Sequence, residues 1–451
     1  MRFLSLFLVI LLAFTATAQK KTLTLDQARQ IALERNLSVV QAENNLVSAQ
    51  SQVLAARGNW LPSLSASTGW SRSQQELKST GEQYINVGGI QVPVAGESNA
   101  ILLSNSFSSG VRASWTVFNG FQREASNSSA TSRAIASEQG VTRTRQGIVF
   151  QTISAYLNVF RTAQLVTVSE ENLKRDQRQL ERITESNRVG ALSLADVYRQ
   201  QSQVATDELA VITTQNNYDK AKADLMALVG LDVLEDYEIV DATIPRDIDS
   251  TAIQESVRMS SNLADLATRA LQARPDYRGA IESYNAAESD VTSAKSSYYP
   301  SVNFSGSYNR SGDNIDKPLK NSFLSWGASL SWTLFDGFRT NQSVQSALAS
   351  KRNAQIALAQ AERDINVDVK KAILDLEASR KSFEVSQKGL LSAGEDRKIA
   401  EERYNLGAGT LLDLLTASAS YVSAQATKVN SVYGFLTAKY NLEFALGERT
   451  Y

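Results

Sequence analysis

Two short stretches decide the fold: residues 115–121 read WTVFNGF and residues 332–338 read WTLFDGF. They lie 217 positions apart, counted from residue 115 to residue 332. The same separation relates Asp196 to Asp413, and it relates the glycines of two later turns, Gly190 and Gly407. A constant separation over most of each copy indicates duplication of a whole structural unit.

Each copy carries the same order of signals. Helical sequence leads to a proline (Pro62 or Pro300), two alternating runs follow, and an Asn/Asp-Gly-Phe break opens a long helical stretch. The two prolines are 238 positions apart rather than 217, so the first copy has 21 extra residues between Pro62 and Trp115. We divide the chain into a signal peptide (1–18), a first repeat (19–230), an inter-repeat equatorial segment (231–262) and a second repeat (263–451).

The amino-acid composition excludes most classes of catalytic and metal-binding site. The 451 residues include no Cys and no His, which removes disulfides, thiolate nucleophiles, the commonest general base and the commonest metal ligand. The formal net charge of −1 gives no electrostatic reason to expect nucleic acid. We therefore expect no enzyme, no cofactor, no metal site and no nucleic-acid partner.

The N-terminus is typical of a signal peptide. Arg2 supplies a positive charge, an apolar run follows from Phe3 to Phe14, and Ala16-Thr17-Ala18 fits the small-x-small cleavage pattern. We expect the mature chain to begin near Gln19. The apolar run is too short to cross a bilayer core of about 30 Å as a helix. We therefore expect the protein to be exported to the periplasm, the outer membrane or the medium.

Four segments alternate between apolar and mostly small polar residues, most weakly in the run from Leu64 to Trp70. The clearest places Leu324, Trp326 and Leu330 at even positions and Ser, Gly or Thr at odd ones. Such alternation over about 11 residues suits a tilted membrane strand with one lipid-facing and one wet face. The expected strands are about 63–72, 107–118, 301–310 and 322–334.

Four strands cannot close a membrane barrel. Barrels need at least about eight strands, because open edges cannot remain in hydrocarbon. Several chains must share one barrel: two would give eight strands and three would give twelve. A soluble sandwich also alternates, but here the face opposite the apolar one is almost uncharged.

The remaining sequence predicts long helices, about 121–230 and 337–447. Residues 121–188 contain no Pro, and 148, 152, 155, 159, 162, 166, 169 and 173 keep the 4-3-4-3 spacing of a coiled coil. Pro62 and Pro300 mark the change from helix to strand, and Gly120 and Gly337 mark the return to helix.

With these features together, the chain resembles the TolC-like outer-membrane efflux protein family over about residues 22–447. The motifs that carry the resemblance are residues 332–337 (WTLFDG) and residues 404–413 (YNLGAGTLLD). The resemblance implies a membrane β-barrel joined to a long α-helical barrel, as a homotrimer that shares twelve strands. It also implies a duct in the outer-membrane lipid of a Gram-negative bacterium, with helices in the periplasm. Its implied partners are a periplasmic adaptor (membrane fusion) protein and an inner-membrane pump.

The resemblance places a closable pore at the two glycine turns, Gly190 and Gly407. It assigns Asp413 to a ring of pore aspartates, and Tyr404 and Asp196 to a latch between helices. A capping role competes for both aspartates, because Ser193-Leu-Ala-Asp196 and Thr410-Leu-Leu-Asp413 fit the capping box.

This chain departs from the family pattern in three places. Gly409 stands where the family has a latch arginine, and Thr416 stands where it has a second pore aspartate. The 21 extra residues predict one longer extracellular loop, about Arg72 to Ser106.

We expect an outer-membrane exit duct that passes small solutes or drugs outward without chemistry. Two alternatives stay open at this point: an exit duct for type I protein secretion, and a periplasmic coiled-coil scaffold that forms no channel.

Overall fold

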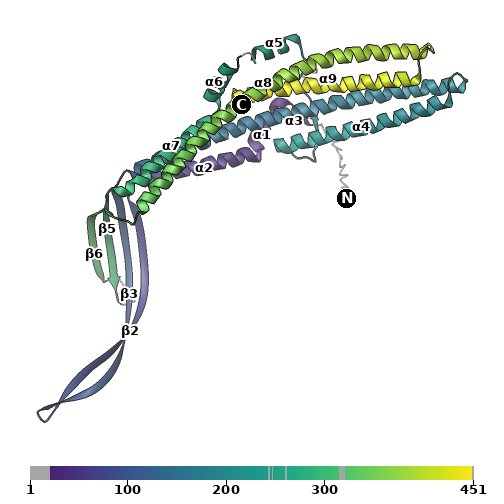
Figure 1. Cartoon of the computed structure of the whole chain (residues 1–451). Coiled ribbons are helices and arrows are strands. Elements are labelled where there is room, and N and C mark those ends of the chain that lie inside the picture. Colours follow the sequence, from purple (N-terminus) through teal and green to yellow (C-terminus); the bar gives the residue numbers. More distant parts are fainter. Residues whose placement is uncertain (1–20, 242–243, 246, 260–261, 314–319, 449–451) are drawn as a thin grey trace, which may run out of the picture. The chain divides into compact units, whose positions relative to one another are not determined.

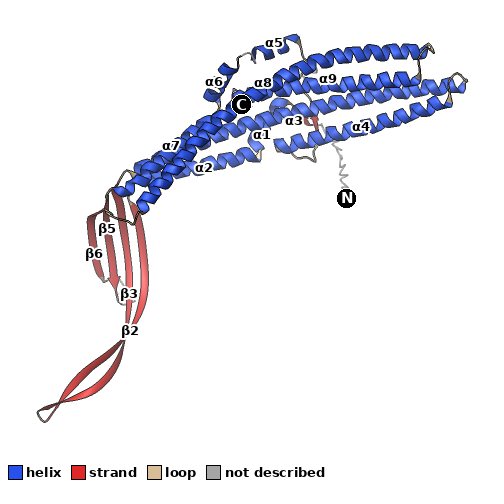
Figure 2. Cartoon of the chain, in the orientation of Figure 1, coloured by secondary structure: helices blue, strands red, loops and turns tan. Residues whose placement is uncertain are grey.

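The computed structural model describes residues 21–241, 244–245, 247–259, 262–313 and 320–448, so the expected signal peptide lies outside the described residues. The chain divides into two compact units. The first comprises residues 1–46, 137–279 and 359–451, and the second comprises residues 47–136 and 280–358. Figures 1 and 2 show the elements of both.

The second unit is built on a four-stranded antiparallel sheet of order β2-β3-β5-β6. The first copy supplies β2 (Ser63–Val87) and β3 (Ile90–Asn119), and the second supplies β5 (Ser301–Gly312) and β6 (Asn321–Ser331). Because β3 pairs with β5, the two copies form one continuous sheet (Figure 2). Within one chain, β2 and β6 are the outer strands of this sheet.

One face of the sheet is apolar across all four strands. The register sets Trp115 opposite Phe304 and Trp326 opposite Gly306, so the alternation seen in each strand lines up between strands. The apolar side chains on this face lie open in the single chain, with Leu64 75 % exposed and Trp326 76 % exposed. The other face carries serines that bond across strands, such as Ser307 with Ser325 at 2.9 Å.

The prediction of a longer loop from about Arg72 to Ser106 is wrong, because β2 and β3 extend into this region. β2 and β3 continue as a paired hairpin until Val87 faces Ile90. Gly88 and Gly89 connect them with φ of +63° and +86°, the two positive angles that a type I′ hairpin turn requires. The 21 extra residues therefore lengthen two strands, because their backbone groups bond to each other.

β6 also differs from its expected range of 322–334, since it ends at Ser331. β5 begins at Ser301, which pairs with Ser331. Residues 332–334 therefore have no strand partner within the chain.

The chain passes from strand to helix through the same backbone conformation in both copies, two consecutive residues with positive φ. Gly120 and Phe121 have φ of +64° and +67°, and Gly337 and Phe338 have φ of +68° and +65°. The Cβ of any other residue at position 120 would lie 2.4 Å from the carbonyl oxygen of Ser296. Only glycine fits there.

Four long helices dominate the first unit. They are α3 (Gln122–Arg188), α4 (Leu194–Val229), α8 (Arg339–Asn405) and α9 (Leu411–Leu446), and α3 and α8 also contribute residues to the second unit. On α4, the buried residues Val197, Gln200, Val204 and Asp207 keep the spacing of a coiled-coil seam.

Shorter elements complete the chain. They are β1 (Lys21–Leu23), α1 (Leu25–Arg35), α2 (Leu37–Gly58), β4 (Tyr237–Ile239), α5 (Ser250–Met259), α6 (Leu263–Ala273), α7 (Pro275–Lys295) and a single 3₁₀ turn (Ser296–Tyr298). β1 pairs in parallel with β4, which brings the inter-repeat segment beside the N-terminal strand. In the described part of the chain, no helix is both long enough and apolar enough to cross a membrane.

Candidate functional site

The two glycine turns adopt the same geometry. Gly190 (φ +79°) follows α3 and Gly407 (φ +72°) follows α8. The amide of Ala191 donates to the Ser186 carbonyl, and that of Ala408 donates to the Arg403 carbonyl, each at 2.8 Å. These six-to-one bonds close a Schellman motif, which satisfies carbonyls at the end of each helix.

Each turn leads into a capped helix. The Thr410 hydroxyl accepts from the Asp413 amide at 3.2 Å, and the Asp413 carboxylate accepts from the Thr410 amide at 3.0 Å. The bonds that this carboxylate accepts from the Thr410 amide and from the Thr410 hydroxyl, the latter at 2.8 Å, hold the pKa of the exposed Asp413 carboxyl below its usual range. Ser193 caps α4 through the Asp196 amide at 3.2 Å, and its hydroxyl bonds to the Asp196 carboxylate at 2.7 Å. The N-caps are therefore Ser193 and Thr410, and Asp413 completes a capping box at the start of α9, whereas the Asp196 carboxylate bonds to the Ser193 hydroxyl.

A small apolar cluster joins the two turns. Ile183, Val197 and Leu411 are its buried centre, and Leu180, Leu192, Tyr404 and Leu415 pack around them. The cluster draws on α3, α4, α8 and α9, so it holds the corresponding ends of both repeats together.

Tyr404 and Asp196, which the resemblance assigns to a latch between helices, share no hydrogen bond among the described residues of the single chain. The Tyr404 hydroxyl is buried and has no hydrogen-bond partner among the residues that the structure describes. Burial, followed by the negative charge of Asp196, raises the pKa of this phenol. Asp196 is close enough to act on Tyr404 electrostatically, but its carboxylate is engaged by Ser193 and by Arg199, at 3.4 Å.

Gly409 packs against the last turn of α8. A Cβ at this position would lie 3.2 Å from the Arg403 Cβ. The Arg403 guanidinium donates to the Ala408 carbonyl at 3.2 Å, and its charge also acts on Asp413. Positive charge near the turn therefore comes from Arg403 on α8. Thr416 bonds back to the Leu412 carbonyl at 2.8 Å.

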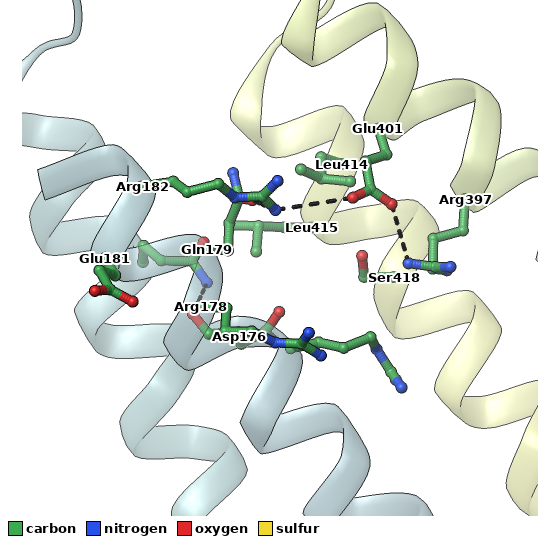
Figure 3. A pocket seen from close by; sticks show the side chains of 12 residues that line it. Asp176, Arg178, Gln179, Glu181, Arg182, Arg397, Glu401, Leu414, Leu415 and Ser418 are labelled. Carbon is green, nitrogen blue, oxygen red and sulfur yellow. Dashed lines mark hydrogen bonds and ion pairs between the residues drawn. The ribbon is translucent and has the colours of Figure 1, made fainter. Parts of the chain in front are cut away.

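Between the helix pairs lies a cleft of about 520 Å³ whose lining includes four arginines and three acidic residues. Figure 3 shows Arg182 of α3 and Arg397 of α8 on either side of Glu401. The distances to the Glu401 carboxylate are 3.8 Å from Arg182 and 3.2 Å from Arg397. The cleft is lined by Arg175, Asp176, Arg178, Gln179, Glu181, Arg182, Gln200, Arg397, Glu401, Leu414, Leu415 and Ser418.

Sequence reasoning missed the buried Asp176 in this lining, and its neighbour Asp207 on α4. The heptad on α3 continues from residue 173 with a step of three to residue 176. Extending it by one step would have shown a carboxylate at an apolar seam position. Among the described residues, no group of three or more acidic, His or Cys side chains could hold a metal ion.

The junction residues lie where the chain changes element. Pro62 directly precedes β2 and Pro300 directly precedes β5, while Gly120 and Gly337 precede α3 and α8. These four residues belong to the second unit, as the turn residues and Asp413, Asp196 and Tyr404 belong to the first.

The model of the outer membrane efflux protein family matches residues 28–231 and 266–448, almost the whole of both repeats. The chain belongs to this family. The two matched ranges also divide where the duplication divides the sequence.

Among its relatives, the pyoverdine export outer membrane protein OpmQ of Pseudomonas aeruginosa is 23 % identical over 423 residues, covering 94 % of this chain and 85 % of OpmQ. The outer membrane protein TolC of Escherichia coli is 25 % identical over 310 residues, covering 67 % of this chain and 62 % of TolC. The crystal structure of the Campylobacter jejuni CmeC outer membrane channel has a TM-score of 0.76 and 18 % identity, covering 94 % of this chain and 85 % of CmeC.

These matches confirm the resemblance, the duct function and the location expected from sequence. As an outer membrane efflux protein, the chain is an exit duct in the outer membrane of a Gram-negative bacterium, with helices in the periplasm. The family consists of channel proteins, and its members work with an adaptor and an inner-membrane pump.

Proposed function

We propose that three copies of this chain form one duct, in which twelve strands close a barrel and the long helices form a tube that continues it. One observation carries this proposal: the sheet has an apolar face on all four strands, while β2 and β6 have no second neighbouring strand in the described part of the chain. A membrane sheet cannot keep such edges, because unpaired N–H and C=O groups in hydrocarbon each cost several kcal/mol.

The simplest closure pairs β6 of one copy with β2 of the next. Three copies of the four-stranded sheet then give twelve strands. The apolar face meets lipid and the serine-rich face lines water, as in other membrane barrels.

We further propose that Asp413 faces the pore at the turns, while Asp196 stays against its own helix. Asp413 is exposed, whereas the Asp196 side chain is 23 % exposed. Three copies would place three Asp413 carboxylates around one opening, which would attract cations and repel anions. The lowered pKa of Asp413 keeps this charge at neutral pH.

The cargo of this proposed duct is a small solute, delivered by a periplasmic adaptor and an inner-membrane pump. The relative OpmQ, named for pyoverdine export, supports a small molecule. Conduction itself needs no chemistry from the chain.

Engineered disulfides test the closure, since the chain has no cysteine of its own. Ser325→Cys on β6 would be combined in turn with Ser63→Cys, Ser65→Cys or Ser67→Cys on β2. We expect at least one pair to give covalent dimers and trimers on non-reducing gels of the detergent-purified protein. The same preparation should conduct ions in a planar bilayer.

The matched control is Ser325→Cys with Ser307→Cys. These residues face each other on β6 and β5 of one chain, so their disulfide stays within the monomer. A monomeric mass, with no intermolecular bond from any of the three pairs, would overturn the shared barrel.

A further inference from the structure

The seam between α3 and α4 contains two aspartates where a coiled coil places apolar residues. Asp176 is 8 % exposed and Asp207 is 5 % exposed. They come from opposite helices of the antiparallel pair that ends at the Gly190 turn. Gln200 on α4 also bonds across this seam, donating to the Asp176 carbonyl at 3.2 Å.

Asp207 is the acidic neighbour of Asp176 across this seam, and besides burial both its hydrogen bonding and its negative charge raise the pKa of the Asp176 carboxyl. Ionised carboxylates only accept hydrogen bonds, so two of them cannot bond without a proton. Gln203 donates to Asp207 Oδ1 at 3.0 Å, but the buried Asp207 Oδ2 has no donor. A single proton between Asp176 and Asp207 supplies the missing donor.

The positive charges near Asp176 are engaged elsewhere. Arg175 of α3 donates to the Asn172 side chain at 3.1 Å and lies 5.8 Å from the Tyr421 ring of α9. Arg397 of α8 donates to Glu401 and stacks over the same ring at 5.0 Å. Both favour the ionised Asp176, but burial and the interaction with Asp207 outweigh them and raise the pKa of Asp176 to about 7.

We propose that Asp176 and Asp207 form a proton-binding site that joins α3 to α4. With one shared proton, the pair bonds the two helices together. When both carboxylates ionise, two buried like charges face each other and the helices separate locally. The site itself does not depend on the trimer, whereas any effect on conduction rests on the proposed duct.

The direction of the pH effect follows from linkage. The folded seam holds its proton up to about pH 7, whereas an unstrained aspartate loses it near 3.9. The closed seam binds more protons than the opened seam between these values, so its stability falls as the pH rises through this range. The site lies 14 residues before Gly190, or roughly 21 Å along the helix at 1.5 Å per residue.

Hydrogen exchange of the full-length protein in detergent tests the site without any transported ligand. Exchange of peptides covering residues 170–182 and 201–213 would be measured between pH 5.5 and 8.5 and corrected for the intrinsic pH dependence. We expect the opening equilibrium to rise roughly thirtyfold across this range if opening restores an ordinary pKa.

Asp207→Asn should remove this pH dependence, because its amide donates to Asp176 at any pH. Asp207→Leu should reduce the pH dependence, because it deletes the repulsion while burial still raises the pKa of Asp176, and it serves as a second variant if the first fails to fold. The matched control is Asp219→Asn on the same helix. Asp219 also accepts from a glutamine four residues earlier, at 3.0 Å, but it is exposed, so this variant should keep the wild-type pH profile.

Wild-type exchange that does not change with pH would overturn the proposal. So would a full pH response that persists in both Asp207 variants. Bilayer recordings over the same pH range separate this result from the proposed duct: a pH-dependent seam in a protein that does not conduct would leave the proton site standing and remove the duct.

Discussion

The indole Nε1 of Trp115 donates a hydrogen bond to the carbonyl oxygen of Trp60 at 3.0 Å. The second copy repeats this bond between Trp332 and Tyr298, at 3.1 Å. Each bond links the end of a strand to the end of the preceding helical segment. Arg123 strengthens the first junction, since its guanidinium stacks over the Trp60 ring at 4.1 Å and donates to the Thr116 carbonyl at 2.7 Å. The duplication has therefore kept a side-chain contact that fixes how strand follows helix.

Trp332→Phe should lower the free energy of unfolding by about 1 kcal/mol, the usual net contribution of one hydrogen bond. Trp332 is exposed to a similar degree as Trp70, so a loss larger than that of Trp70→Phe reports the bond to Tyr298. Trp70→Phe is the control, because Trp70 is exposed on the sheet and packs near Phe107. Denaturant unfolding in detergent would compare the two. Equal losses would show that the indole bond is not what stabilises the junction.

Gly120→Ala should destabilise the protein more than Gly337→Ala. Both sites require positive φ, which costs an L-residue roughly 1–2 kcal/mol. Only at Gly120 would the new Cβ also meet a backbone carbonyl, at 2.4 Å, whereas nothing lies within 4 Å at Gly337. Thermal unfolding of the two variants measures the difference. If they unfold alike, the close approach of Ser296 has been relieved by backbone movement.

Arg274→Met should destabilise the first unit by about 2 kcal/mol, toward the low end for a broken buried ion pair because the acidic partners are partly exposed. The Arg274 side chain is 5 % exposed and contacts the carboxylates of Asp276, at 2.6 Å, and Asp368, at 3.1 Å. Adding Asp276→Asn should recover part of the lost stability, because it removes one carboxylate that has lost its ion-pair partner. Urea unfolding at pH 7 would test both variants.

The same network predicts an acid dependence. Burial by itself would raise the pKa of Asp276, but the bond to Arg274 and the charges of Arg274 and Arg143 hold it below its usual value. Its contribution to stability is therefore present above the ordinary pKa and is lost as the pH falls through the lowered one. Arg274→Met should weaken this acid dependence, and an unchanged acid profile would contradict the assignment.

Tyr404→Phe should leave stability within about 0.5 kcal/mol of wild type, or raise it, because a buried hydroxyl without a partner contributes no bond to lose. Its single-channel conductance should also match wild type, since the hydroxyl has no hydrogen-bond partner among the described residues of the single chain. A large conductance increase in Tyr404→Phe would show that the hydroxyl forms a latch bond in the assembled duct.

Asp413→Asn should reduce cation selectivity while keeping α9 capped. Its side-chain oxygen can still accept from the Thr410 amide, which Asp413 does at 3.0 Å. Asp413→Ala would remove charge and cap together, so the pair separates the two roles. Reversal potentials in a planar bilayer with a salt gradient report selectivity. Unchanged selectivity in both variants would mean that Asp413 does not face the pore.

The sequence by itself determined the duplication, the four strands, the long helices and the junctions at Pro62, Pro300, Gly120 and Gly337. These features are local or periodic: alternation fixes a strand face, 4-3-4-3 spacing fixes a helix seam, and Gly or Pro restricts the backbone directly. The Gly88-Gly89 turn could also have been predicted, because two glycines between Val87 and Ile90 are typical of a β-hairpin turn.

The tertiary structure decided which side chains meet. It placed Asp207 against Asp176 although the two are 31 positions apart, and it left the Tyr404 hydroxyl alone beside an Asp196 engaged by Ser193. Such pairings depend on how two helices are rotated and offset against each other. That alignment is set by the packing of many side chains at once, which no single stretch of sequence specifies.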